Sequence, residues 1–252
     1  SDAKAANWQI ILIGCLALAV TMGVGRFAFT PLMPLMLRDG TFQAQTGAEW
    51  AAANYVGYLI GALTASQFAS NPKRGLLLSL MGITLTTAAI YLIDPSPLSL
   101  YSGAFLRLIS GVFSAWTMVC ASTWCLGELS RNRAPQLGAW IYTGVGIGIV
   151  LAGLLAWLGG QQTAKTLWLE LGLLAAAGTA IVWYGLTQNH SDPSKPSEAV
   201  QHKNQTLKSK NHFGLVLCYG TFGFGYIVQA TFLPTMARQQ ISDPLVFGLT
   251  WP

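Results

Sequence analysis

Two arginines stand inside stretches that otherwise have the composition of membrane-spanning helices. Arg26 lies in TMGVGRFAFTPLMPLMLR at residues 21–38, and Arg107 lies in FLRLISGVFSAW at residues 105–116. An ionisable side chain in hydrocarbon costs at least about 2.5 kcal/mol, so each arginine is a candidate functional residue. A buried cation also needs a partner, and no carboxylate lies near the middle of an apolar stretch. We therefore expect either a substrate anion or an acid on helices that follow this chain.

A structural role for the two arginines stays open at this point. Each guanidinium can donate hydrogen bonds to backbone carbonyls, or it can be hydrated inside a water-filled cavity. By helical rise, Arg107 lies about 14 Å from Leu98 and Arg26 about 18 Å from Arg38. We therefore expect both arginines at a similar depth, in the outer half of the membrane.

Other kinds of chemistry are less well supported by the residues. The three histidines are dispersed in a polar stretch, the four cysteines lack the spacing of metal ligands, and no cluster of acid, base and nucleophile lies at depth. The G-x-G pairs follow no strand and precede no lysine, so they are not phosphate loops. The sequence therefore predicts no metal, no cofactor and no enzyme.

Composition indicates an integral membrane protein, because 52% of the residues are hydrophobic and only 9% are charged. Seven uncharged stretches approach or exceed the roughly 20 residues that a helix needs to cross a bilayer. The first and fourth extend past an embedded arginine, to about Leu37 and back to about Leu98. The stretches are Ala5–Gly25, Trp50–Pro72, Gly75–Ile93, Leu108–Gly127, Ala134–Ala164, Leu171–Ser191 and Asn211–Ala237.

The distribution of lysine and arginine predicts the orientation. With a cytoplasmic N-terminus, the inner segments hold nine of these residues and the outer segments hold three. The net charge of +5 is then an orientation signal, since the basic residues are scattered without interleaved aromatic side chains. We expect a lipid bilayer and no nucleic acid among the partners.

The first helix recurs 200 residues later. Residues 214–238 match residues 14–38 at seven of 25 positions, including both glycines that flank Val24 and the residue at Pro34. A polar stretch separates the two copies. We therefore predict a six-helix bundle at 1–187, a cytoplasmic linker at 188–212, and the start of a second bundle at 213–252. The fold is expected to be all-α, with helix seven and the beginning of helix eight following the first bundle in a truncated twelve-helix architecture.

Small residues recur every four positions in the second and fifth predicted helices. Gly57 and Gly61 lie in the second, and Gly144 and Gly148 lie in the fifth. This spacing lets a neighbouring helix approach closely, although glycine is also simply common in membrane helices.

The motifs resemble those of the major facilitator superfamily, whose members contain parallel six-helix repeats. The stretch GVGRFAFTPLMPLML at Gly23–Leu37 resembles the first-helix signature of its YbfB-like transporters. Arg107 and Gly111 are similar to the helix 4 motif, with Ser110 in place of the usual glutamine. Gly144, Gly148 and Gly153 resemble the helix 5 antiporter motif, in which Ile149 replaces the proline and Ala152 replaces a glycine. The signature residues are Gly23, Gly25, Arg26, Phe27, Thr30, Pro31 and Pro34.

The resemblance implies a cavity lined by helices 1, 4, 7 and 10. Its polar residues in this chain would be Arg26, Arg107, Tyr226 and Gln229, and the repeat makes Tyr226 the counterpart of Arg26. The implied function is secondary transport of a small solute across a bacterial inner membrane, with protons as the candidate coupling ion. We expect an organic anion between Arg26, Arg107 and Tyr226. The alternatives are a proton-coupled drug or metabolite exporter and a non-transporting receptor or scaffold.

Overall fold

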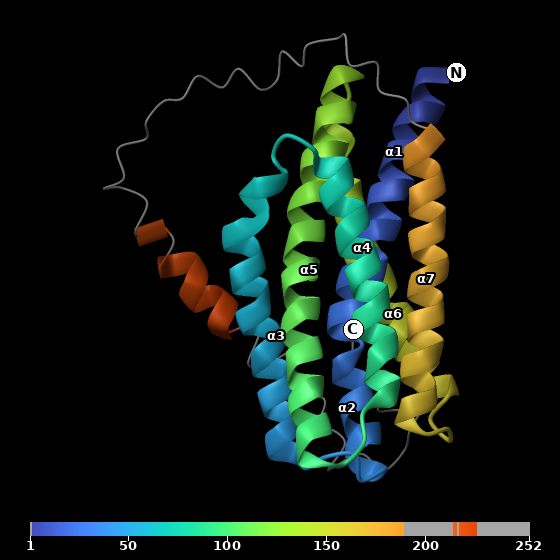
Figure 1. Ribbon diagram of the computed structural model, residues 1–252. Helices are drawn as coiled ribbons and strands as arrows, with labels where there is room; N and C mark the ends of the chain where they lie inside the picture. Colours follow the sequence, from blue (N-terminus) through green and yellow to red (C-terminus); the bar gives the residue numbers. More distant parts are fainter. Residues whose placement is uncertain (1, 189–213, 216, 226–252) are drawn as a thin grey trace. The chain divides into compact units, whose positions relative to one another are not determined.

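The computed structural model describes residues 2–188, 214–215 and 217–225, in which helices are joined by short turns and loops. The chain divides into two compact units, residues 1–195 and residues 196–251. In the second unit, residues 214–215 and 217–225 are helical. The predicted linker falls almost wholly outside the described residues. The elements of the first unit, shown in Figure 1, are α1 (Asp2–Leu18), η1 (Ala19–Phe27), α2 (Phe29–Arg38), α3 (Ala44–Thr64), η2 (Ala65–Phe68), α4 (Pro72–Ala89), η3 (Ile90–Leu92), α5 (Pro97–Arg131), η4 (Pro135–Tyr142), α6 (Thr143–Leu158) and α7 (Ala164–Gln188).

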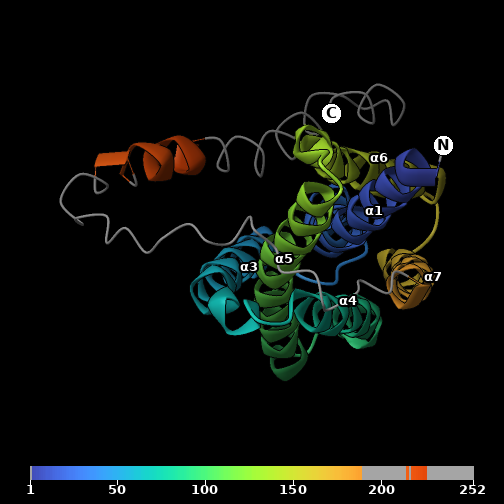
Figure 2. The same cartoon turned by 90° about the horizontal axis from the view of Figure 1, so that it is seen from above.

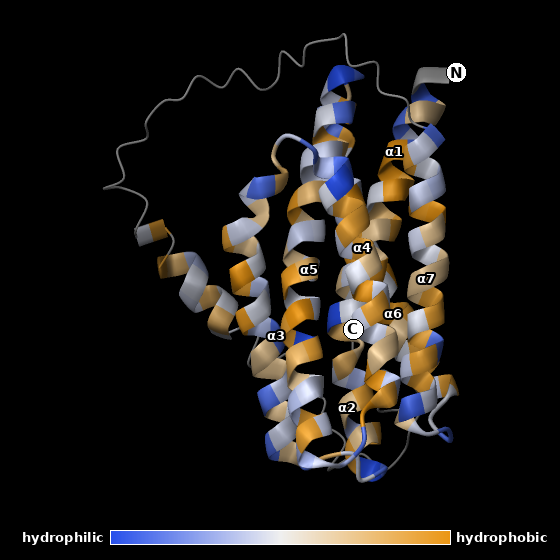
Figure 3. Cartoon of the chain, viewed as in Figure 1, coloured by the Kyte–Doolittle hydropathy of each residue, from blue (hydrophilic) through white to orange (hydrophobic). Residues whose placement is uncertain are grey.

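The described helices confirm the prediction of an all-α membrane protein with several crossings. Among them, five continuous helical stretches are long and apolar enough to span a bilayer. Figure 3 shows the apolar residues distributed along the whole length of these helices. The helix α3 adds 21 residues at the position of the second predicted crossing. The five stretches are Lys4–Arg38, Pro72–Leu92, Pro97–Arg131, Pro135–Leu158 and Ala164–Gln188.

Helix α5 lies between α3 on one side and α4 on the other (Figures 1 and 2). Helix α7 packs beside α4 and α1, and α6 packs along η1. The interior between them is apolar, and Trp50 and Trp168 have no exposed surface. This arrangement places the central part of the first crossing against α5 and α6.

The helices begin where the sequence supplies caps. Asn71 Oδ1 accepts a hydrogen bond from the Arg74 backbone N–H at 3.1 Å, and Pro72 occupies the first turn of α4. Ser96 and Pro97 start α5 in the same way. Helix α2 ends at Arg38, and Gly40 in the turn that follows has a φ of +68°, in the left-handed region that glycine adopts without strain.

A polar network joins the end of α2 to the turn between α6 and α7. Asp39 Oδ2 accepts a hydrogen bond from the backbone N–H of Ala164 at 2.6 Å and so satisfies a free donor at the start of α7. Arg38 donates to the carbonyls of Gly160 and Gln162, in the turn between α6 and α7. These contacts fix the end of α2 to the end of α6 and the beginning of α7.

The first crossing is irregular in its middle. Pro31 and Pro34 predict a bend, but the observed irregularity begins before them, because Ala19–Phe27 form a π-helix between α1 and α2. The backbone N–H of Ala28 donates to the Gly23 carbonyl at 2.9 Å, which is the five-residue spacing of a π-helix. Such segments are rare and frequently lie at functional sites, so the π-helix marks the part of the bundle to examine.

Candidate functional site

The π-helix exposes backbone carbonyls that need donors from elsewhere. Pro31 has no N–H, so the carbonyls four and five residues before it, of Phe27 and Arg26, compete for fewer helical donors. Thr21 already uses its hydroxyl on the Ala17 carbonyl, at 2.8 Å. The local sequence therefore favours a segment in which some carbonyls can accept hydrogen bonds from a neighbouring helix.

Arg107 of α5 supplies those donors. Its Nη1 donates to the Gly25 carbonyl at 2.8 Å, and its Nη2 donates to the Arg26 carbonyl at 3.0 Å. The guanidinium also lies over the Phe29 ring, 4.8 Å from its centroid, and only 2% of the residue is exposed. Arg107 thus joins α5 to the π-helix through two charge-assisted hydrogen bonds.

Neighbouring polar residues on α5 and α3 complete this junction. Ser110 Oγ donates to the Gly25 carbonyl at 3.2 Å, and Ser114 Oγ lies 3.4 Å from the Thr21 carbonyl. Asn54 on α3 donates from Nδ2 to the carbonyl of Arg107 at 2.9 Å. These buried side chains hold three helices in one register.

Arg26 has different surroundings, although it is the residue whose carbonyl Arg107 binds. Its guanidinium carbon lies 4.0 Å from the centroid of the Tyr58 ring, 5.5 Å from that of Tyr55 and 5.4 Å from that of Phe27. Only 9% of Arg26 is exposed, and its Nε has no hydrogen-bond partner among the described residues. Within the same part of the chain, the ion pairs join other residues. The cation is therefore held mainly by aromatic faces.

The glycines of α3 lie where that helix touches α5. A Cβ at Gly57 would stand 1.9 Å from the Leu108 carbonyl oxygen, and one at Gly61 would stand 2.5 Å from that of Val112. Gly111 makes the reciprocal approach, with 2.1 Å to the Asn54 carbonyl oxygen. The two backbones are in direct contact, as small residues at this spacing permit.

The glycines of α6 lie against the first crossing. A Cβ at Gly144 would stand 1.9 Å from the Cys15 carbonyl oxygen, and one at Gly148 would stand 2.4 Å from that of Ala19. A Cβ at Gly23 would meet the Gly148 backbone at 2.2 Å. The π-helix therefore has α6 tightly against one side and α5 bonded to it at Gly25 and Arg26.

The remaining predicted residues divide into three groups. Gly25 packs closely on Ile83, where a Cβ would lie 2.7 Å from the side chain. Thr30 is half-buried and Pro31 and Pro34 are buried at the start of α2. Tyr226 and Gln229 lie outside the described residues, so their role remains a prediction.

Sequence reasoning did not select Tyr55, Tyr58 or Asn54 as site residues. The two tyrosines lie three positions apart, which places them on one face of a helix, but the helix also carries many apolar residues. Only the packing of α3 on α5 brings that face to Arg26. Ser110 departs from the helix 4 motif, and the sequence does not indicate a hydrogen-bond partner for it.

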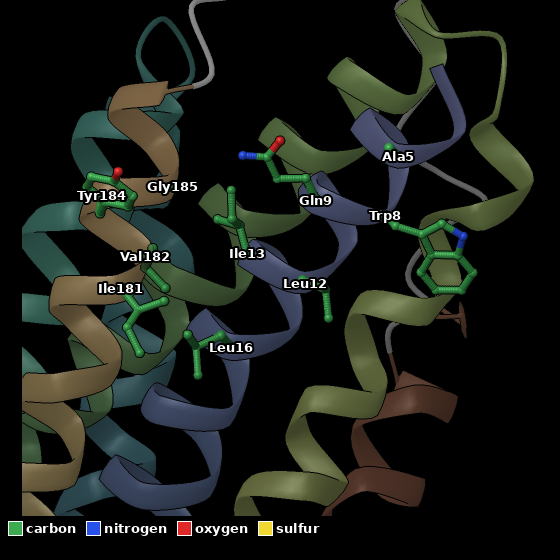
Figure 4. A pocket seen from close by; sticks show the side chains of 10 residues that line it. All are labelled: Ala5, Trp8, Gln9, Leu12, Ile13, Leu16, Ile181, Val182, Tyr184 and Gly185. Atoms are coloured by element: carbon green, nitrogen blue, oxygen red, sulfur yellow. The ribbon is translucent and has the colours of Figure 1, made fainter. Parts of the chain in front are cut away.

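A separate groove lies between α1 and α7 (Figure 4). It has a volume of about 490 Å³ and is lined by apolar side chains such as Leu12, Leu16 and Ile181. No charged side chain belongs to the described residues that line it. This groove offers nothing to orient an ion, and we do not include it in the site.

The long apolar helices, packed through glycines around a buried polar junction, define a multi-pass membrane protein of the major facilitator type. The chain belongs to the family described as the uncharacterised MFS-type transporter YbfB, whose model matches residues 18–252. The resemblance that the first-helix signature indicated is thereby confirmed. The chain is also 28% identical, over 190 residues, to a protein of Pseudomonas putida named a gallate transporter. That match covers 73% of this chain and 41% of the relative, so the chain spans less than half of the relative's length.

Proposed function

We propose that the complete protein is a secondary carrier of small organic anions and that Arg26 binds the anion. The observation that carries this proposal is the setting of Arg26: a buried guanidinium held among aromatic rings, whereas the terminal nitrogens of Arg107 donate to backbone carbonyls. A guanidinium in a low-dielectric interior forms strong charge-assisted hydrogen bonds, so a carboxylate that reaches Arg26 gains a strong interaction. Arginine stays charged at any cellular pH and binds carboxylates with a planar fork of donors.

Small aromatic carboxylates are the substrates that we propose first. Three aromatic rings surround the Arg26 guanidinium, and they provide apolar surface beside the cationic group. The similarity to a protein named a gallate transporter supports the same class, because gallate is a small hydroxylated aromatic carboxylate.

The two arginines have separate roles in this proposal. The terminal nitrogens of Arg107 already donate to two carbonyls of the π-helix, which is the structural role that the sequence left open. Direct contact between Arg107 and substrate, and contacts from Tyr226 and Gln229, remain predictions. We propose that Arg107 holds the backbone that carries Arg26, while Arg26 itself contacts the anion.

The mechanism that we propose is alternating access by two six-helix bundles, the first of which is formed by residues 1–187. Uptake of radiolabelled gallate or benzoate into vesicles that contain the full-length protein tests this. Transport down or against a solute gradient supports a carrier, whereas binding without any transport favours a receptor or scaffold. A pH gradient imposed on the vesicles tests proton coupling.

Arg26→Lys is the decisive variant because it keeps the charge and loses the planar fork. We expect anion transport to fall by about tenfold to a hundredfold, the range of a lost charged hydrogen bond. Arg131→Lys, which changes an arginine in an exposed pair with Glu128, is the matched control and should transport normally. Unchanged anion transport by Arg26→Lys would overturn the proposal and favour the drug exporter.

We further propose that the N-terminus is cytoplasmic and that the membrane is a bacterial inner membrane. The excess of basic residues in the inner segments supports this orientation. Two cysteine variants test this orientation. Ser70→Cys places a thiol after α3, at its proposed inner end, and Gln161→Cys places one after α6, at its proposed outer end; both positions are exposed. In intact cells, a membrane-impermeant thiol reagent should label the cysteine at 161 and spare the one at 70. The reverse pattern contradicts this orientation.

A further inference from the structure

We infer that Tyr58 is a positioning residue of the anion site and acts through Arg26. Its ring is the closest of the three, with the guanidinium carbon 4.0 Å from the ring centroid. The Phe27 and Tyr55 rings are more than 5 Å from the same atom. This inference rests on the proposed function, because it explains how the donors of Arg26 are oriented for an anion.

The position of Tyr58 is fixed by the contact between α3 and α5. A Cβ at Gly111 would lie 2.8 Å from the Tyr58 backbone nitrogen, and Gly57 touches the backbone of Leu108 in the same way. Asn54, one turn earlier on α3, donates to the carbonyl of Arg107. The backbone on both sides of Tyr58 therefore cannot slide along α5 without breaking a buried hydrogen bond or separating two tightly packed surfaces.

The ring has a definite effect on the guanidinium. The face of an aromatic ring attracts a cation, and a planar guanidinium stacks on it. The N–H donors of a stacked guanidinium point outward in its plane, where an acceptor can reach them. Arg26 has four side-chain torsions, and ordering a free arginine on binding would cost conformational entropy. Tyr58 removes part of that cost in advance, so an anion meets donors that are already oriented.

The contact between Arg107 and Phe29 can be compared with the contact between Arg26 and Tyr58. The Arg107 guanidinium also lies on a ring, that of Phe29, but its terminal nitrogens are used on the Gly25 and Arg26 carbonyls. The same type of contact thus accompanies a structural arginine at one position. The Nε of both arginines lacks an acceptor among the described residues, so the difference lies in the terminal nitrogens. Those of Arg107 are used on two backbone carbonyls of the bundle, whereas the Arg26 guanidinium lies against the Tyr58 ring, which orients its donors for an anion.

The test is a double-mutant cycle on the full-length protein in detergent, with gallate and benzoate as the probes. The variants are Tyr58→Leu, Tyr58→Phe, Arg26→Lys and the double variant Arg26→Lys with Tyr58→Leu. Tyr101→Leu is the control, because it removes a tyrosine that is 75% exposed and lies on α5 outside the site. Calorimetry gives the dissociation constant of each probe, and thermal unfolding gives the stability of each variant.

We expect Tyr58→Leu to weaken anion binding by about three- to tenfold, which corresponds to a partly buried cation–π contact. Tyr58→Phe keeps the ring and loses only the contact of the hydroxyl with the Arg26 guanidinium, so it should bind the anion more tightly than Tyr58→Leu. In the Arg26→Lys background, where no planar fork remains, Tyr58→Leu should cause a clearly smaller loss. A merely structural role would lower the melting temperature and would show no such dependence on Arg26.

The contradicting outcomes separate this inference from the proposed function. If Arg26→Lys weakens anion binding and Tyr58→Leu does not, the inference is wrong and the proposed function stands. An equal loss from Tyr58→Leu in both backgrounds also overturns the inference. If neither probe binds the unaltered protein, or Arg26→Lys binds both normally, the proposed function fails and the inference fails with it.

Discussion

Arg26 and Arg107 carry the same charge in neighbouring membrane helices, and the bundle treats them differently. Arg107 is 2% exposed and binds two backbone carbonyls, whereas Arg26 is 9% exposed and lies among three aromatic rings. The first arrangement satisfies both terminal nitrogens within the protein. The second stabilises the cation through aromatic faces. The Nε of both arginines lacks an acceptor among the described residues, so the two settings differ in what their terminal nitrogens contact. A buried arginine in a membrane protein is therefore not evidence of a ligand until its donors have been followed to their acceptors.

The difference originates in the backbone of the first crossing. The π-helix Ala19–Phe27 presents the carbonyls of Gly25 and Arg26 toward α5, and Pro31 lacks the backbone N–H that could donate to the Arg26 carbonyl. Arg107 is used for this local need. The Arg26 side chain points toward α3, where the nearest side chains are tyrosines. Arg107 thus donates hydrogen bonds to carbonyls of the irregular helix that carries Arg26.

The largest effect on stability is expected from Arg107→Leu. This change removes both donors to the π-helix and leaves the Gly25 and Arg26 carbonyls short of partners in a low-dielectric interior. Two charged hydrogen bonds at about 1.5–3 kcal/mol each predict a loss of about 3–6 kcal/mol in the free energy of unfolding. Thermal unfolding in detergent measures it, with Arg26→Leu as the matched comparison. A melting temperature that falls no further for Arg107→Leu than for Arg26→Leu contradicts the division of roles.

Gly57→Leu should come next, because it forces α3 away from α5. The added side chain begins with a Cβ that would lie 1.9 Å from the Leu108 carbonyl oxygen. Overpacking of this kind typically costs about 1–3 kcal/mol. Since Tyr58 is the following residue, anion binding should weaken as well. Gly127→Leu is the control, because nothing lies within 4 Å of a Cβ there; equal effects at the two positions would argue against a tight contact.

Asn54→Leu tests whether α3 and Arg107 are linked. The change removes the hydrogen bond from Nδ2 to the Arg107 carbonyl and should lower the free energy of unfolding by about 0.5–1.5 kcal/mol. In a protein that already carries Arg107→Leu, the loss should differ, because residues of one network are not additive. Strict additivity in thermal unfolding would show that the two residues act independently.

Ser110→Ala should have the smallest effect. Its hydroxyl shares the Gly25 carbonyl with Arg107, at the longer distance of 3.2 Å, so the carbonyl keeps a donor when the serine is removed. We expect a loss of at most about 1 kcal/mol and unchanged anion transport. A large loss of transport from this variant would indicate that Ser110 contacts the substrate itself.

The order of these effects sharpens the comparison. Changes around Arg107 should act mainly on stability, and changes around Arg26 should act mainly on anion binding and transport. A variant set in which both readouts always fall together would mean that the two arginines form a single functional unit.

The sequence alone determined the class of this protein. Uncharged stretches of about 20 residues can be satisfied in a bilayer only as helices, so their number and length predicted a polytopic all-α fold before any tertiary contact was known. The embedded arginines were visible for the same reason, since a charge in hydrocarbon contrasts with everything around it. The first-helix signature at residues 23–37 was specific enough to indicate the family to which the chain belongs.

The tertiary structure decided what each arginine does. From the sequence, both an anion-binding role and a structural role were open for Arg26 and for Arg107, because neither side chain has a partner nearby in the chain. The π-helix was not predicted, since it depends on α5 supplying donors from about 80 residues away, at the Gly25 and Arg26 carbonyls. The position of Tyr58 beside Arg26 could be learned only from the structure, in which Gly57 and Gly111 let α3 pack closely against α5. Such partners are determined by the packing of whole helices. The spacing of residues within one helix shows which of them share a face, but it does not show which neighbouring helix that face will contact.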